Sequence, residues 1–141
     1  MPPQASTTHP RTMNQSHAQT PLVQRPHSVT GMHIGFVSTR LAGTDGVSLE
    51  TQKWATVLER MGCRCFYFAG VADTPAERSR VVPEAFFDHP YVRVLQQIAF
   101  SRTVRPPAIT RRIRELTAYL KAHIAAFVRD YDIDCWWSRT R

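Results

Sequence analysis

Two glycines and an aspartate lie close together in residues 39–46, which read Thr-Arg-Leu-Ala-Gly-Thr-Asp-Gly. A glycine-containing turn ahead of a helix can present backbone N–H groups to an anion, and glycine lets a ligand approach the main chain closely. The pattern therefore predicts a contact with a phosphate group or a sugar hydroxyl. The segment lacks Gly-x-Gly-x-x-Gly and a following Lys-Ser or Lys-Thr, which argues against a dinucleotide fingerprint and against a P-loop. A second interpretation, that the glycines only make the turn, stays open.

Three further residues are weaker candidates for ligand contacts. Arg40 could meet a phosphate, although a lone arginine in a loop is more often solvated. Glu50 could accept a hydrogen bond from the loop backbone or a sugar hydroxyl, but a carboxylate near a helix N-terminus is favourable without any ligand. His89, beside Pro90, could act as a base in a cleft or simply occupy a turn. The sequence assigns no catalytic residue, and no cofactor is expected.

The chain has three cysteines, an odd number that disfavours a secreted disulfide scaffold and fits a reducing cytoplasm. Cys63 and Cys65 lie two positions apart, which places both thiols on one face of a strand. Together with Cys135 they could suggest a metal, but no fourth ligand is evident, so we interpret them as buried small residues and expect no metal. Trp136 and Trp137 would point to opposite faces of one strand, which indicates burial.

Two strands and a helix would hold the glycine loop in place. Residues 33–38 and 63–69 are short apolar runs typical of strands buried on both faces. Between them, Asp45 or Thr44 is a good N-cap for a helix that Gly62 ends. Two strands joined by a helix run parallel, with a right-handed crossover. The apolar stripe expected on this helix consists of Val47, Trp54, Val57, Leu58 and Met61.

A second helix and a third strand follow. We expect the helix to begin near Thr110, after two prolines, and to end at residues 130–132, while residues 133–138 predict a strand. Residues 71–109 are broken by prolines, and residues 91–100 within them fit either a short strand or a helix. Helices alternating with buried strands imply the α/β class, here a partial Rossmann-like open parallel sheet. The stripe expected to cover the sheet is Ile113, Leu116, Thr117, Leu120, Ile124, Phe127, Val128 and Tyr131.

The two ends of the chain raise separate expectations. Residues 1–31 are rich in proline and contain no acid, so we predict a disordered tail there and a domain over residues 32–141. A start of translation at Met32 is the alternative. At the other end, the chain stops at Arg141, directly after a strand that we expect to be central, and no helix follows it to cover the sheet. Because parallel sheets need both faces covered, we expect either a fragment or a partner that supplies the missing layer.

The chain is basic, with a formal net charge of +7 over 141 residues. Such a charge favours anionic partners, and the arginines gather ahead of and within the start of the second helix. A peripheral contact with an anionic membrane is one expectation. No nucleic-acid motif accompanies the cluster, so no nucleic acid is expected, and no apolar run approaches the roughly 18 to 20 residues of a membrane-spanning helix. The expected location is cytoplasmic, with this membrane contact as an option. The cluster consists of Arg102, Arg105, Arg111, Arg112 and Arg114.

Several motifs, in order, resemble the N-terminal part of the retaining glycosyltransferases of family four, which have the GT-B fold. The resemblance covers about residues 32–138. The motifs are Met32-His-Ile-Gly-Phe-Val-Ser, Gly43-Thr-Asp-Gly-Val-Ser-Leu-Glu50, Trp54, Leu58-Glu-Arg-Met-Gly62, Phe66-Tyr-Phe-Ala-Gly70, Pro83-Glu84, His89-Pro90 and Tyr131-Asp-Ile-Asp-Cys135.

This resemblance implies the acceptor-side half of an enzyme that moves a sugar from a nucleotide-sugar donor to a sugar or other hydroxyl acceptor. The family's usual Gly-Gly-Val-Glu is replaced here by Asp-Gly-Val-Ser at residues 45–48. In the family, the donor pocket and its carboxylate pair belong mainly to a second Rossmann-like domain, so these 141 residues alone are expected to be inactive. The substrate-binding role of the family's glycine loop falls on Gly43, Thr44, Asp45, Gly46 and Val47.

Two other hypotheses stay open. One is a basic α/β module that binds a phosphorylated ligand or partner and performs no chemistry. The other is a misassembled or frameshifted product without a stable fold, which a cooperative thermal transition would exclude. Coding DNA that continues beyond Arg141 into a second α/β pattern would favour a truncated transferase. The sequence does not identify the donor sugar, the nucleotide, the acceptor or the oligomeric state.

Overall fold

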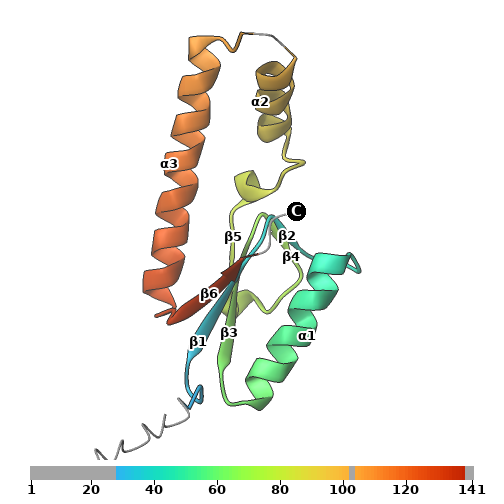
Figure 1. Ribbon diagram of the computed structural model, residues 1–141, viewed down its shortest axis with the longest axis vertical. Coiled ribbons are helices and arrows are strands. Elements are labelled where there is room, and N and C mark those ends of the chain that lie inside the picture. Colours follow the sequence, from blue (N-terminus) through green and yellow to red (C-terminus); the bar gives the residue numbers. More distant parts are fainter. Residues whose placement is uncertain (1–27, 102–103, 139–141) are drawn as a thin grey trace, which may run out of the picture.

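The computed structural model describes residues 28–101 and 104–138, which form a four-stranded sheet with a helix on each face (Figure 1). The strand order is β5-β3-β1-β6, and every neighbouring pair is parallel. A second, two-stranded parallel sheet pairs β2 with β4. The expected open parallel α/β sheet is therefore confirmed. The strands are β1 His33–Val37, β2 Arg40–Leu41, β3 Arg64–Ala69, β4 Val71–Ala72, β5 Ser79–Val81 and β6 Cys135–Ser138.

Helices α1 and α3 cover opposite faces of the sheet, and α2 lies beside the N-terminal half of α3, away from the strands (Figure 1). The prolines of residues 71–109 separate short elements, and residues 91–100 within them are helical. The helices are α1 Gly46–Arg60, α2 Pro90–Phe100 and α3 Pro107–Asp130, with single 3₁₀ turns at Ala76–Arg78 and Pro83–Ala85.

Aromatic residues of β1 and β3 form the core on both sides of the sheet, because successive residues of a strand point to opposite faces. Phe36 and Tyr67 stack on the α1 side, with their ring centroids 5.8 Å apart. On the α3 side, Phe68 packs against Phe127, whose ring comes from α3 and is fully buried. Gly35 makes this approach possible, since a Cβ there would lie 3.0 Å from Cε1 of Phe127.

Helix α1 contacts the sheet through small side chains, so the expected apolar stripe was partly wrong. Val47 and Leu58 do pack against the core cluster. The larger residues Trp54, Val57 and Met61, however, are 49%, 47% and 50% exposed. The aromatic rings beneath α1 already fill the space next to the strands, and small residues let the helix lie close to them. The buried residues of α1 are Ser48, Thr51 and Ala55.

Helix α3 begins at Pro107, three residues before the expected Thr110. Proline suits this first position because its fixed φ matches the helix and its missing N–H would have no partner there. The second half of the expected stripe is confirmed, whereas Val128 remains 36% exposed. The residues of α3 and its C-terminal end that pack against the sheet are Leu120, Ile124, Phe127 and Tyr131.

Strand β6 lies at the edge of the sheet in the part of the chain that the structure describes, and not at its centre as expected. Trp137 packs edge-on against Phe36, with the centroids 5.7 Å apart, so its expected burial is partly confirmed. Trp136 is 55% exposed, so the expectation of burial was wrong for this residue. An edge strand has a neighbour on one side only, and α3 lies over the central strands.

The cysteines Cys63 and Cys65 are buried in the cluster under α1, as expected, whereas Cys135 is exposed, so the expectation of burial was wrong for this residue. Burial raises the pKa of the Cys65 thiol to about 11, so it remains protonated at neutral pH. A protonated, buried thiol is a poor nucleophile and a poor metal ligand. Because both side chains are buried in the same cluster, Cys63 and Cys65 act as small core residues.

Residues 28–31, assigned to the tail from the sequence, contact the domain. Gly31 donates a backbone hydrogen bond of 2.8 Å to the carbonyl of Gly62. The Thr30 hydroxyl donates to the carbonyl of Met61 at 3.3 Å. The predicted tail over residues 1–27 lies outside the described residues, as do Arg102 and residues 139–141.

Candidate functional site

The glycine loop follows β1 and lies at the carboxyl edge of the sheet. Strands β1 and β3 run parallel with His33 beside Arg64, and the Ser38 amide continues the pairing by donating to the carbonyl of Phe68. In open α/β sheets this edge is where ligands usually bind. The parallel strand order therefore puts the loop at this edge.

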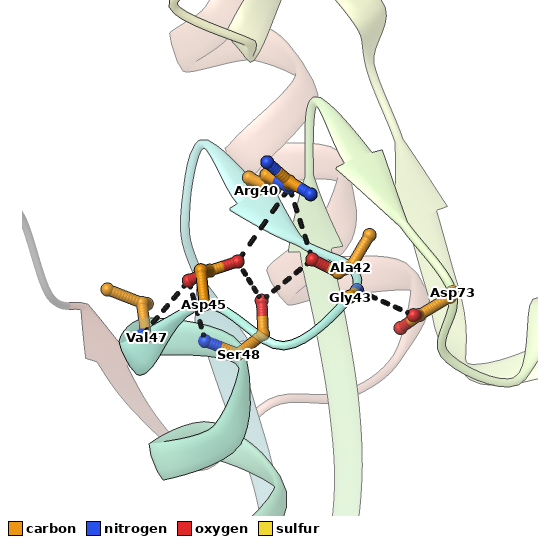
Figure 2. Close-up of polar contacts among 7 residues, drawn as sticks. All are labelled: Arg40, Ala42, Gly43, Asp45, Val47, Ser48 and Asp73. Atoms are coloured by element: carbon orange, nitrogen blue, oxygen red, sulfur yellow. Dashed lines mark hydrogen bonds and ion pairs between the residues drawn. The ribbon is translucent and has the colours of Figure 1, made fainter.

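Asp45 is the N-cap of α1, one of the two capping residues expected from the sequence. Its Oδ1 accepts hydrogen bonds from the backbone amides of Val47 and Ser48, at 3.0 and 3.1 Å (Figure 2). Its Oδ2 accepts from the Ser48 hydroxyl at 2.7 Å. The carboxylate thus partners amides at the helix start that would otherwise be unpaired, and its negative charge is favourable at that end of the helix.

A second carboxylate holds the turn itself. Asp73, which follows β4, accepts a 2.8 Å hydrogen bond from the Gly43 amide through Oδ2 (Figure 2). Gly43 has a φ of +77°, a conformation that glycine adopts without strain. Arg40 contacts both ends of the loop. Its Nε donates to the carbonyl of Ala42 at 3.1 Å and lies 3.7 Å from Oδ2 of Asp45.

Three amides of the loop and the helix start are therefore already partnered, and this bears on the two ligands expected from the sequence, a phosphate group and a sugar hydroxyl. The chain's own carboxylates already accept from the amides of Gly43, Val47 and Ser48. A phosphate would have to displace one of them and would meet two negative charges at close range. A hydroxyl group, by contrast, can donate to a carboxylate oxygen and accept from a neighbouring donor. The geometry of this site favours hydroxyl ligands over phosphate.

The hydrogen bonds of Asp45 make the stability of α1 depend on pH. The side-chain bond from Ser48, followed by the backbone bonds and the charge of Arg40, lowers the pKa of Asp45 below its ordinary value of 3.8. A lowered folded-state pKa stabilises the fold above the unfolded-state pKa, and this stabilisation is lost as the pH falls through the folded-state pKa.

We expect Asp45→Ala to reduce the free energy of unfolding at pH 7 by about 1 kcal/mol, the usual cost of losing an N-cap. The difference between this variant and the original chain should shrink as the pH falls below 3.8. Urea denaturation at several pH values measures this difference in the free energy of unfolding. Thr44→Ala is the control, since Thr44 is exposed and is not the cap. A difference that stays constant down to pH 2 would contradict this role of the Asp45 carboxylate.

The structure does not join the other two candidates to the loop. Glu50 accepts a 2.9 Å hydrogen bond from the indole N–H of Trp54, within α1. His89 precedes α2 as its N-cap without making a side-chain capping bond, and its buried Nδ1 has no partner among the described residues. Within residues 28–101 and 104–138, the side chains of Glu50 and His89 make no hydrogen bond or ion pair to residues 40–48.

Two residues of the site were missed in the sequence. Ser48 had a signal, because Asp45 and Ser48 have the i, i+3 spacing of an N-cap and the first-turn residue whose side chain bonds back to it. Asp73 had none, since 30 positions separate it from Gly43 and only the parallel pairing of β2 with β4 brings them together.

Comparisons with protein-family models, curated proteins and solved structures give no match to this chain. The functional assignment therefore rests on the geometry of the chain's own residues. Among the helices of the described residues, none is long and apolar enough to cross a membrane.

Proposed function

We propose that this chain is the acceptor-side α/β domain of a glycosyltransferase that transfers a sugar from a nucleotide-sugar donor to a hydroxyl acceptor. In this proposal residues 43–47 lie against the acceptor. The observation that carries it is the pair of carboxylates, Asp45 and Asp73, hydrogen-bonded to one glycine loop at the carboxyl edge of a parallel sheet. Carboxylate oxygens beside a fixed main chain are suited to receive sugar hydroxyls.

The alternative, a module that binds a phosphorylated ligand, has less support. A helix N-terminus attracts phosphate through unpaired amides, and here Asp45 occupies those of Val47 and Ser48. Arg40 is the nearest cation to the cap, and it already faces the Asp45 carboxylate. A phosphate at this loop would gain little attraction beyond what the chain itself supplies.

A peripheral membrane contact is a second part of the proposal, at the end of the α2–α3 hairpin. Phe100 and Val104 are 81% and 79% exposed there, beside the exposed side chains of Arg105, Arg111 and Arg112. Arginines near an anionic surface contribute about 1 kcal/mol each, and apolar side chains add burial at the interface. We expect the chain to sediment with vesicles that contain phosphatidylserine and not with phosphatidylcholine vesicles. Equal sedimentation with both would contradict this contact.

Saturation-transfer NMR with nucleotide-sugars tests the function. With methyl α-glucoside as a model acceptor, present together with UDP-glucose or GDP-mannose, we expect saturation of the glucoside protons and not of the base protons, because in this proposal the nucleotide pocket belongs to another domain. The purified chain should also release no free nucleotide from either donor. Saturation confined to the base, or turnover of a nucleotide-sugar by this chain alone, would overturn the proposed role.

A further inference from the structure

A pocket lies between the first two turns of α1 and the segment that follows β4. Its volume is about 170 Å³, which is room for several water molecules and hence for a small polar molecule. It lies beside the glycine loop and shares Asp73 with it. The lining residues that the argument uses are Ser48, Thr51, Gln52, Tyr67, Asp73 and Thr74.

Thr51 lines this pocket from the helix side. The residue is only 3% exposed, and its hydroxyl makes no hydrogen bond to any residue of the described part of the chain. Helical threonines usually satisfy this group locally, as Thr56 and Thr117 do by donating to the carbonyl four residues earlier, at 2.8 Å in both cases. Among the described residues, His89 Nδ1 is the one fully enclosed side-chain atom without a partner, so the Thr51 hydroxyl is accessible from the pocket and a molecule bound there can supply its partner.

Tyr67 supplies a second hydroxyl from the strand side. The residue is 8% exposed, lines the pocket, and its ring is fixed by stacking on Phe36. Burial raises the pKa of Tyr67 to about 12, so its hydroxyl keeps its proton and can donate at neutral pH. Within the described residues this hydroxyl also has no hydrogen-bond partner that would compete with a ligand.

The charge of the residues that line the pocket indicates which class of ligand can bind there. Asp73 contributes a carboxylate and Gln52 an amide, and the lining contains no lysine, arginine or histidine. An anionic ligand would meet the Asp73 charge with no compensating cation. Hydroxyl groups both donate and accept, which matches two hydroxyls, an amide and a carboxylate around one small volume.

We propose that this pocket binds a neutral, polyhydroxylated small molecule whose hydroxyls bond to Thr51, Tyr67 and Asp73. The site goes beyond the proposed function, because its ligand class follows from its own lining and not from a role of residues 43–47. A sugar ring or another compact polyol has the required chemistry.

Titration of the ¹⁵N-labelled full chain with glucose tests this site. The amides of Thr51, Gln52 and Thr74 should shift and saturate, with a dissociation constant of about 1 mM or weaker. Thr51→Val should weaken binding at least about fivefold, the size expected for one lost hydrogen bond. Thr56→Val is the matched control on the exposed face of α1 and should bind as the original chain does.

The melting temperature of Thr51→Val is expected to stay close to that of the original chain, because the removed hydroxyl makes no hydrogen bond to another described residue. If this variant fails to fold, Tyr67→Phe serves in its place, with the same expected loss of binding. No saturable shift at these amides, equal binding by Thr51→Val and Thr56→Val, or tighter binding of inorganic phosphate than of glucose would overturn the site.

The titration also separates this site from the proposed function. Shifts at Thr51, Gln52 and Thr74 without shifts over residues 43–47 would support the pocket and leave the proposed acceptor loop unsupported. Shifts confined to residues 43–47 would overturn the pocket alone.

Discussion

Gly70→Ala is expected to destabilise the chain by about 4 kcal/mol or more, which places it among the most damaging single substitutions. A Cβ at Gly70 would lie 2.1 Å from the backbone nitrogen of Phe86 and 2.6 Å from its Cα. Those atoms belong to the main chain and cannot move aside as a flexible side chain would. Since domains are stable by only about 5 to 15 kcal/mol, we expect a large fraction of the variant to be unfolded at 37 °C.

Gly70 has this effect because it follows β3 at the edge of the sheet that carries the loop. Its amide donates to the carbonyl of Thr39 at 3.0 Å, and the preceding Ala69 carbonyl accepts from Val82 at 2.8 Å. A displacement of Phe86 would therefore disturb the backbone bonds between β3 and β5. The loop at residues 40–48 would lose part of its support.

Urea denaturation compares Gly70→Ala with Gly46→Ala, a change of the same kind at another glycine. A Cβ at Gly46 meets nothing within 4 Å, and its φ is not positive. Alanine there should stabilise α1 by about 0.4 to 1 kcal/mol. Equal effects of the two substitutions would contradict the close contact of Gly70 with Phe86.

The second large effect is expected from Phe127→Ala, with a loss of about 3 to 5 kcal/mol. Phe127 is fully buried, and its ring contacts Phe68 and Tyr131 at centroid distances of 5.7 and 5.4 Å. The space over Gly35 would become a cavity, because Gly35 has no side chain to fill it. The attachment of α3 to the sheet depends on this ring.

Tyr119→Ala, on the same helix, is the matched aromatic control. Tyr119 is 42% exposed, so its removal should cost about 1 kcal/mol or less. Both variants are compared by urea denaturation at pH 7. A loss below 1 kcal/mol for Phe127→Ala would mean that α3 does not pack on the sheet through this residue.

The strands and the order of the helices could be predicted because local sequence patterns indicate where each element begins and ends. Apolar runs predicted β1 and β3, Asp45 predicted the start of α1, and Gly62, with a φ of +88°, ends it as expected. These signals act over a few residues and do not depend on distant contacts.

The buried face of each helix was harder to predict, because it depends on the side chains of the sheet against which the helix packs. Periodicity assigned Trp54 and Met61 to the core, but α1 packs through Ser48, Thr51 and Ala55 against rings from β1 and β3. Large side chains do not fit where a helix lies close to the sheet. The distance between the helix and the sheet cannot be predicted from the local sequence.

The site was predicted in position but not in chemistry. The apolar runs and the N-cap placed the loop between β1 and α1, whereas the hydrogen bond from the Gly43 amide to Asp73 depends on the pairing of β2 with β4. The sequence shows that carboxylates are present, but it does not show which backbone amides donate hydrogen bonds to them. Of the two ligands expected from the sequence, a phosphate group and a sugar hydroxyl, these hydrogen bonds favour the hydroxyl.

The most direct test is a comparison of two ligands at the loop amides of residues 43–47, followed in ¹⁵N-labelled chain. Methyl α-glucoside, a neutral sugar, should shift these amides in a saturable way, and inorganic phosphate at the same concentration and ionic strength should not. Saturable shifts with phosphate, and none with the glucoside, would show that the carboxylates of Asp45 and Asp73 give way to an anion and that the hydroxyl-binding account of this loop is wrong.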